Sequence, residues 1–328
     1  MIKPSTRSMI NSPTAVRPLF VMADALLDRR PRMTIRLCRF IVSRLSTQSS
    51  VPADRLRAAA AVTQGVAVAS LGDTAGSVDI NDYVISAFKQ SRDAEVRQHV
   101  AWAMVNKGWN LFAVDRLDEA IAVFRDLSDL VPFEPPFMHP VAQGLMNWAS
   151  VLDRTGRHVE EMAIYDRIAG ALESAKTEAE VHLLRWALLR KAITLTEMHK
   201  YNEAVELCDS ILSRWWDLSD WSTSTKDREF LAATIRHRAM AMFARGEYQV
   251  AIGDVDRLLK RYLWSNERGL TEEVAWAMLG KAASLLALER PQEAMHTLEA
   301  LAARFSRSRD KQVQAAVAMA MRRMEELG

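Results

Sequence analysis

The sequence predicts an all-α protein built from stacked helical hairpins, and internal repetition is the main reason. The letters VAWAM occupy residues 100–104 and return at 274–278, 174 residues later. The match extends without a gap, so that 100–124 aligns with 274–298. Three segments between them, 145–165, 188–208 and 235–255, share the same pattern. The chain therefore takes four repeat steps of about 43 or 44 residues, a period typical of helical-repeat proteins.

Each repeat is predicted to hold two helices joined by a short turn. The first helix carries a small residue followed three positions later by a larger apolar one, and a turn marked by Gly156 or Gly246 follows in two repeats. The small residues are Gly108, Ala149, Ala192, Ala239 and Ala282 in the first helices, and Ala120, Ala204, Ala251 and Ala294 in the second. Small residues let helix backbones approach closely. One hairpin cannot bury its own apolar face, but a stack of hairpins can.

In chain order the sequence divides into four predicted parts. Residues 1–50 form a basic N-terminal segment that is partly helical or flexible, and 51–93 form a degenerate hairpin. Five repeats occupy 94–308, and 309–328 is a capping helix over the last open face. The net charge is +7 in the first fifty residues and −5 in the rest of the chain. A mildly acidic body of this kind is a poor general binder of phosphate.

The segment 32–45 is predicted to be a short basic amphipathic helix. Arg32, Arg36 and Arg39 recur at helical spacing, and Met33, Leu37, Phe40, Ile41 and Leu45 lie largely opposite them. Such a helix can lie on anionic lipid, or it can pack as the first helix of the stack with a solvated basic edge. Residues 1–50 are also rich in Arg and Ser and poor in acid, which fits a targeting segment or a misassigned start codon. No apolar stretch is long enough to predict a membrane span.

The repeats resemble the tetratricopeptide repeat, and most closely a bacterial variety with units longer than usual. The segments WAMVNKGWNL and RLDEAIAVF carry the resemblance, together with the small and large apolar pairs and the Gly-Arg and Gly-Glu turns. The resemblance covers about residues 94–305 and implies a right-handed α-solenoid whose first helices line a groove. Glu161 stands where the pattern has Ala, so we expect that hairpin to be splayed or shifted.

The sequence contains no catalytic constellation. It has no Gly-rich phosphate loop and no HExxH, GxSxG or CxxC motif, and its seven histidines are scattered. Cys38 and Cys208 are too few for a disulfide framework or a structural zinc site. Cys208 replaces a large apolar residue of its helix, which predicts a buried thiol. We therefore expect no enzymatic activity, no cofactor, no metal and a reducing compartment, the cytoplasm.

The resemblance assigns particular first-helix residues to the inner wall of the groove. The predicted peptide-binding residues are Trp102, Asn106, Trp109, Asn147, Arg154, Trp186, Arg190, Arg236, His237, Met240 and Trp276. Aromatic side chains among a few polar groups are typical of a peptide-binding surface. Trp102, Trp186 and Trp276 recur at equivalent places, which equally fits packing between repeats. Only Asn147 and Arg190 match the carboxylate clamp with which some proteins of this repeat class hold chaperone tails, so that mode of binding is not expected.

Three further tryptophans, Trp215, Trp216 and Trp221, lie close together in one polar linker. Exposed, they would form a contact patch. Folded back, they would fill the gap left by a longer repeat step, and the sequence favours this second interpretation.

The resemblance implies a non-enzymatic scaffold or adaptor that binds a peptide or helical segment of a partner protein in the groove. Two alternatives stay open. Arrays of helical hairpins can read RNA base by base, although the acidic body disfavours nucleic acid. Residues 32–45 could instead recruit the protein to a membrane. The sequence does not give the partner's identity, and it leaves a homo-oligomer open.

Overall fold

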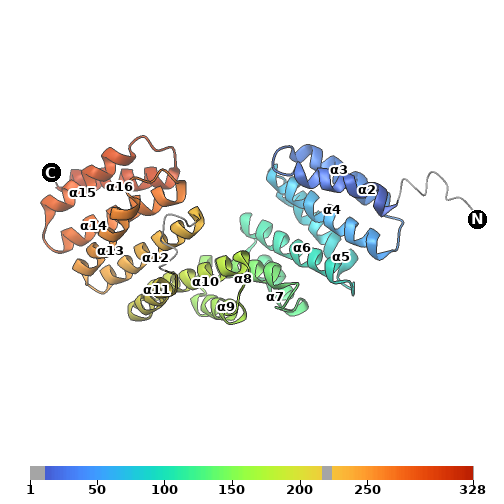
Figure 1. The fold of residues 1–328 in the computed structure, drawn as a ribbon, viewed down its shortest axis with the longest axis horizontal. Coiled ribbons are helices and arrows are strands. Elements are labelled where there is room, and N and C mark those ends of the chain that lie inside the picture. The colour runs from blue at the N-terminus through green and yellow to red at the C-terminus, as the bar shows by residue number, and fades with distance from the viewer. Residues whose placement is uncertain (1–11, 216–223, 328) are drawn as a thin grey trace, which may run out of the picture. The chain divides into compact units, whose positions relative to one another are not determined.

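The computed structural model describes residues 12–215 and 224–327, and it confirms an all-α architecture of stacked hairpins (Figure 1). None of the described residues lies in a strand. The helices are α2 (Pro13–Ala25), α3 (Pro31–Leu45), α4 (Val51–Ser70), α5 (Thr74–Phe88), α6 (Ala94–Ala113), α7 (Leu117–Leu130), α8 (Met138–Arg154), α9 (His158–Ala171), α10 (Glu178–Glu197), α11 (Tyr201–Trp215), α12 (Thr225–Ala244), α13 (Tyr248–Tyr262), α14 (Arg268–Ala287), α15 (Pro291–Phe305) and α16 (Lys311–Leu327).

The chain divides into two compact units, which we call unit 1 (Met1–Leu183) and unit 2 (Leu184–Gly328). Unit 1 holds the hairpins from α2 to α9, and unit 2 runs from within α10 to α16. This division was not among the boundaries that the sequence suggested after residues 50, 93 and 308. Those boundaries concern the repeat pattern and remain predictions.

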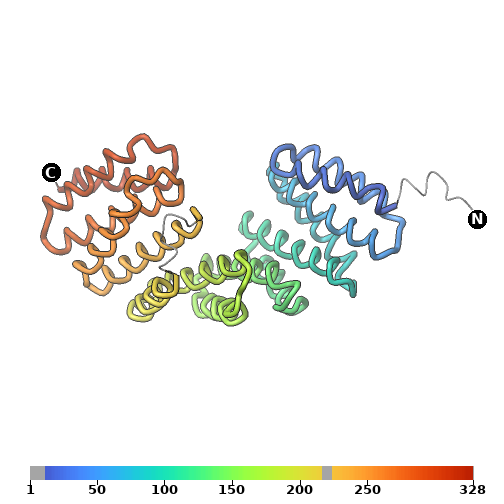
Figure 2. The backbone as a smooth tube through the Cα atoms, viewed as in Figure 1, coloured from blue at the N-terminus to red at the C-terminus, as the bar shows by residue number. Residues whose placement is uncertain are grey.

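Within each unit, successive hairpins stack through their first helices. In unit 1, α4 packs against α6 and α6 packs against α8, while each also packs against its own second helix. In unit 2, α12 packs against α14, and α14 packs against α16. The backbone tube shows these neighbours side by side (Figure 2). The lone helix α16 thus covers the α14/α15 hairpin at the C-terminal end of the stack.

The hairpin turns from α4/α5 to α14/α15 share one geometry, even where the sequence has no glycine. A residue with positive φ follows the first helix, and the N–H of the next residue donates to a carbonyl in the helix's last turn, as from Lys200 to Leu195 O at 2.9 Å. The positive-φ residues are Gly72, Asp115, Gly156, His199, Gly246 and Glu289, with φ between 58° and 86°. This bond satisfies carbonyl groups that the helix end leaves unpaired. Asp115, His199 and Glu289 adopt this left-handed conformation although residues with a side chain disfavour it, and the capping bond compensates for the cost.

The small residues of the repeat pattern lie at the contacts between paired helices. Gly108 shows why: a Cβ added there would lie 2.5 Å from ring atoms of Phe124, whose side chain is fully buried on α7. Glu161, which replaces the expected Ala, is also fully buried. Its carboxylate accepts a hydrogen bond from Tyr165 Oη at 2.9 Å and lies 3.1 Å from His158 Nδ1. Local hydrogen bonds therefore allow a carboxylate where the repeat pattern has a methyl group.

The N-terminal helices pack onto the stack as a further hairpin. Cys38, Ile41 and Leu45 of α3 are fully buried among residues of α2 and α4, whereas Met33 and Phe40 are exposed. The apolar stripe predicted for this helix is therefore divided between the core and solvent. No helix in the described part of the chain combines the length and the apolar character needed to span a membrane.

Trp215, the first of the three linker tryptophans, ends α11 and is buried. Its ring lies edge-on to Phe230 of α12 with the centroids 6.0 Å apart, and the guanidinium of Arg185 lies 5.5 Å from the centre of the Trp215 ring. This position agrees with a space-filling role for Trp215. Trp216 and Trp221 lie outside the described residues.

Candidate functional site

An apolar pocket of about 360 Å³ lies in unit 2. The C-terminal halves of α12 and α14 form two of its walls, and α13 and the turn from α10 to α11 complete it. The lining residues are Thr196, Glu197, His199, Tyr201, Arg236, Ala239, Met240, Phe243, Ala244, Ala251, Val255, Trp276, Ala277, Gly280, Ala283 and Ser284. The volume is at the lower end of the range for ligand pockets, which suits one or two side chains rather than a large cofactor.

Large apolar side chains stand at the rim of this pocket. Met240 is 45% exposed and Phe243 is 38% exposed, although both sit on a rigid helix. Trp276 faces the same pocket from α14 and is half-buried. Large apolar groups gathered around a concavity are a common mark of an interaction site.

The pocket is open because α14 has small residues where its counterpart in unit 1 does not. The α14/α15 hairpin and the α6/α7 hairpin carry the two VAWAM segments, and we call them the sister hairpins. Gly280 and Ala283 stand at the places that Asn106 and Trp109 occupy in unit 1. A Cβ added at Gly280 would meet nothing within 4 Å. The space at Gly280 is therefore real and accessible to a ligand side chain.

One edge of the pocket is polar, and its arginine is paired with a carboxylate. The Nε of Arg236 pairs with a carboxylate oxygen of Glu273, and its Nη2 donates to His237 Nε2 over 2.8 Å. Burial lowers the pKa of His237 to about 3, helped by the positive charges of Arg236 and Arg190. The imidazole is therefore neutral near pH 7, and because its Nε2 accepts, its proton is on Nδ1.

The end of α10, the turn after it and the first residue of α11 contribute another part of the lining. His199 Nδ1 lies 2.6 Å from Tyr201 Oη, and both residues line the pocket. The positive φ of His199, 60°, directs the chain around this turn. A hydroxyl and an imidazole in this part of the lining can exchange hydrogen bonds with the backbone of a bound segment.

The structure brings part of the predicted groove together in unit 2. Arg236, Met240 and Trp276 line the pocket, and His237 contacts Arg236 at its edge. Arg190 is half-buried and close enough to affect the titration of His237. Trp186 instead packs edge-on to Phe230 with the centroids 6.0 Å apart, which is the packing interpretation for this tryptophan.

The other predicted residues lie in unit 1 and do not belong to this pocket. Trp109 is 48% exposed and its ring lies 5.4 Å from that of Phe112. The guanidinium of Arg154 lies 5.5 Å from the centre of the Phe112 ring, and Arg154 pairs with Asp115 at 2.9 Å. The remaining three are half-buried: Trp102 packs edge-on to His139 at 5.3 Å, Asn147 accepts from Gln143 at 3.2 Å, and Asn106 lies beside them on α6.

Sequence reasoning missed the residues that create the space. Gly280 and Ala283 have no polar or aromatic group, and the hydroxyl of Ser284 donates within its own helix to Gly280 O at 2.9 Å, so a search for polar or aromatic binding groups passes over them. The available signal was the comparison of the sister hairpins, in which Trp109 and Asn106 become Ala283 and Gly280. His199 and Tyr201 were missed because they lie in a turn, outside the first helix that the repeat pattern assigns to the groove.

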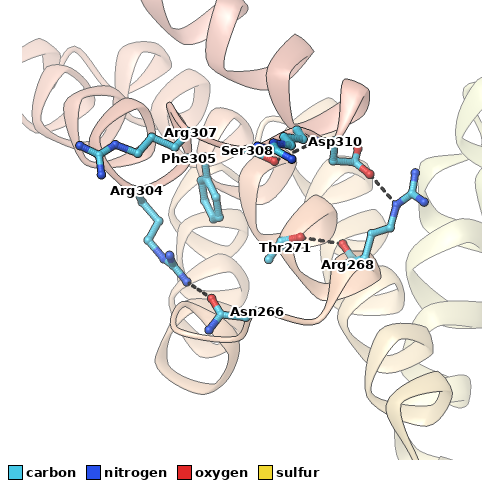
Figure 3. Close-up of a pocket in the computed structure, with 9 residues that line it drawn as sticks. Asn266, Arg268, Thr271, Arg304, Phe305, Arg307, Ser308 and Asp310 are labelled. Carbon is cyan, nitrogen blue, oxygen red and sulfur yellow. Dashed lines mark hydrogen bonds and ion pairs between the residues drawn. The ribbon is translucent and has the colours of Figure 1, made fainter.

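A second, more open cavity of about 590 Å³ lies near the start of α14 and the loop between α15 and α16 (Figure 3). Arg304 donates to Ser265 O and to Asn266 Oδ1, both at 3.2 Å, and Arg268 pairs with Asp310 at 2.6 Å. Four polar side chains of this cavity thus tie α15 to the loop before α14, and the start of α14 to the loop before α16. We regard the cavity as a structural junction.

Neither cysteine has the properties of a nucleophile. Cys38 and Cys208 are both buried free thiols. Burial raises the pKa of each thiol to about 12. Because the thiolate is the reactive form, both side chains are inert core groups near pH 7.

No protein-family model and no curated protein sequence matches the chain. Similar solved structures include the apo form of RapI, with a TM-score of 0.68 and 12% identity over 95% of this chain and 84% of that one. The apo form of the quorum sensor NprR from B. thuringiensis has a TM-score of 0.59 and 13% identity over 95% and 82%. A tetratricopeptide repeat protein from Parabacteroides merdae ATCC 43184 has a TM-score of 0.56 and 12% identity over 94% and 99%. These likenesses show the fold, which is a tetratricopeptide-like helical repeat.

Proposed function

We propose that this tetratricopeptide-like helical-repeat protein is a non-enzymatic interaction scaffold that binds a peptide or helical segment of a partner protein. The binding site is the apolar pocket of unit 2. The observation that carries the proposal is the pocket itself, about 360 Å³ in volume and bordered by the exposed side chains of Met240 and Phe243.

The physical basis is burial of apolar surface on a preformed wall. Met240, Phe243 and Trp276 belong to helices whose backbones are already ordered, so little conformational entropy is lost on their side when a ligand docks. An apolar side chain that enters beside Gly280 would remove these groups from water and gain about 25 cal/mol for each Å² of apolar surface buried. Arg236 and Tyr201 both line the pocket, and their polar groups would fix the register of the bound backbone.

Part of the predicted groove stays outside this proposal. Trp102, Asn106, Trp109, Asn147 and Arg154 belong to unit 1, and their role in binding remains a prediction.

The membrane alternative is weaker than the sequence suggested, because Ile41 and Leu45 of α3 are in the core and unavailable to lipid. Two free buried thiols fit a reducing compartment, and on that ground we propose the cytoplasm.

The test fills the pocket without disturbing the fold. Gly280→Leu places a side chain in open space, and it also replaces a helix-interior glycine by a better helix former. Gly253→Leu is the matched control, because Gly253 is exposed on α13, is equally unobstructed and does not line the pocket. Both variants should therefore fold at least as stably as the parent protein.

A displayed library of random peptides about 16 residues long, selected against the full chain, supplies ligands of a length that can form a helix. We expect enriched peptides to bind the parent protein and the Gly253→Leu control equally, and to bind Gly280→Leu about tenfold or more weakly by fluorescence anisotropy. Equal binding to Gly280→Leu, or no enrichment at all, would refute the pocket as a peptide site.

A further inference from the structure

Two carboxylates that form no ion pair among the described residues lie on the two helices that wall the apolar pocket. Glu229 of α12 precedes Arg236 by seven positions, and Glu272 of α14 precedes Trp276 by four. Residues spaced in this way lie on one face of a helix. Both carboxylates are therefore on the side of α12 and α14 that leads into the pocket, about one to two helical turns from its lining residues.

The neighbouring positive charges are already paired with other acids. Arg236 pairs with Glu273, Arg228 pairs with Glu267 at 2.5 Å, and Arg268 pairs with Asp310 at 2.6 Å. Glu229 and Glu272 themselves form no ion pair and no hydrogen bond among the described residues, although both are half-buried.

The surroundings of Glu229 and Glu272 raise the pKa of both carboxylates. Burial raises the pKa of Glu229, and the negative charges of Glu273 and Glu267 raise it further. Burial also raises the pKa of Glu272, together with the charges of Glu273, Asp310 and Glu229, against a smaller opposing effect of Arg236. A positive charge brought to this surface from outside would relieve the repulsion.

Resting on the proposed function, we infer that the segment bound in the pocket of unit 2 is a positively charged amphipathic peptide. It places a Lys or Arg against Glu229 and Glu272 and a large apolar side chain in the pocket beside Gly280. The cation supplies an ion-pair partner that the two carboxylates do not have among the described residues, and the apolar residue fills the space bordered by Met240 and Trp276.

The geometry also sets the spacing within the peptide. Glu272 lies eight residues, or about 12 Å, before Gly280 along α14. A helical ligand matches this distance with a cation seven or eight positions from its apolar anchor. An extended ligand matches it with a cation about four positions away. An acidic peptide or a nucleic acid would be repelled by the same two carboxylates.

The experiment compares charge removal at the pocket with charge removal elsewhere on unit 2. The test variant is Glu229→Gln with Glu272→Gln. The matched control is Glu299→Gln with Glu325→Gln, which removes the same charge from exposed positions of α15 and α16 that do not line the pocket. Random peptides are selected in parallel on the parent protein, on both charge variants and on Gly280→Leu.

We expect peptides enriched on the parent protein to carry Lys or Arg at the stated spacing from a large apolar residue. Replacing that cation by Gln should weaken binding to the parent protein and to the control about tenfold, and should change binding to the test variant less than about threefold. The preference of the parent protein for the cationic peptide over its Gln version should also fall at high salt.

The outcomes separate the two proposals. Enriched peptides that lose affinity on Gly280→Leu, but that lack a cation or bind the test variant with an unchanged preference, overturn this inference and leave the proposed function standing. Enriched basic peptides that bind Gly280→Leu as well as the parent protein overturn both, because the surface charge would then act without the pocket.

Discussion

The sister hairpins α6/α7 and α14/α15 share a sequence motif but present different surfaces. In unit 1 the positions after VAWAM include Asn106 and Trp109, and the tryptophan ring rests on Phe112. In unit 2 the same places hold Gly280 and Ala283, and both line a pocket. The shared motif therefore builds the helical scaffold, while two small residues decide whether the scaffold leaves room for a ligand.

The sister hairpins also differ in how tightly the paired helices meet. Gly108 of α6 faces the buried ring of Phe124, and no side chain fits between them. At the same place α14 has Ala282, which is buried opposite α15, where the position of Phe124 is taken by Leu298. The pair Gly108 and Phe124 fills the space between the helices with a large ring opposite no side chain. The pair Ala282 and Leu298 fills the equivalent space with a smaller side chain opposite a methyl group.

The largest expected effect comes from making one substitution in both sister hairpins. Gly108→Leu must displace Phe124, so we expect it to destabilise the protein by about 3 kcal/mol or more. Gly280→Leu meets open space and should stabilise α14 by about 0.5–1 kcal/mol, because glycine is a poor helix former. Urea unfolding of the full chain, compared with the parent protein, measures both.

A paired variant sharpens this prediction. Gly108→Ala together with Phe124→Leu copies Ala282 and Leu298 into unit 1, and should cost less than the sum of the two single substitutions. Additive costs would mean that Gly108 and Phe124 do not depend on each other, contrary to the contact in the structure.

The second prediction concerns acid, which should weaken unit 2 more than unit 1. Burial and the positive charges of Arg236 and Arg190 lower the pKa of His237 to about 3, whereas burial lowers the pKa of His99 in unit 1 with Glu95 acting in the opposite direction. A histidine with a lowered folded-state pKa stabilises the fold above its unfolded pKa, and this contribution is lost as the pH falls. Between about pH 6.5 and about pH 5 the loss from His237 reaches about 2 kcal/mol.

Hydrogen exchange of the full chain, corrected for the intrinsic effect of pH, measures this difference. Protection of α12 and α14 should fall on acidification more than protection of α4 and α6, and His237→Gln should reduce the loss. His99→Gln is the control in unit 1. A uniform loss of protection in both units would contradict the prediction.

The smallest expected effect is a gain in stability from removing the two unpaired carboxylates. Because their folded-state pKa values are raised, Glu229 and Glu272 lower the stability increasingly as the pH rises through those values. Glu229→Gln with Glu272→Gln should therefore melt at a higher temperature than the parent protein near neutral pH and at the same temperature near pH 4, with a gain below about 1 kcal/mol. Thermal unfolding at the two pH values tests this, and a loss of stability at neutral pH would mean that the carboxylates have partners in the fold.

The sequence by itself determined the helical architecture. The repeat period, the small residues and the spacing of apolar residues reflect contacts within one hairpin or between adjacent hairpins. Because these contacts are short-range, the sequence predicted the paired helices, the buried Ala and Gly positions and the buried Cys208 thiol. It also pointed to Arg236, Met240 and Trp276, because the resemblance specifies which first-helix positions face a groove.

Only the tertiary structure decided where space remains and how each exception is accommodated. The pocket needs side chains from residue 196 to residue 284 to converge, and Gly280 and Ala283, which leave its space open, have no functional group. The turn at His199 forms without glycine because a capping hydrogen bond supports its backbone. Glu161 is buried because Tyr165 and His158 bond to it. The local pattern that predicts a helix is insensitive to these contacts, since each depends on which atoms the finished fold brings within hydrogen-bonding or packing distance.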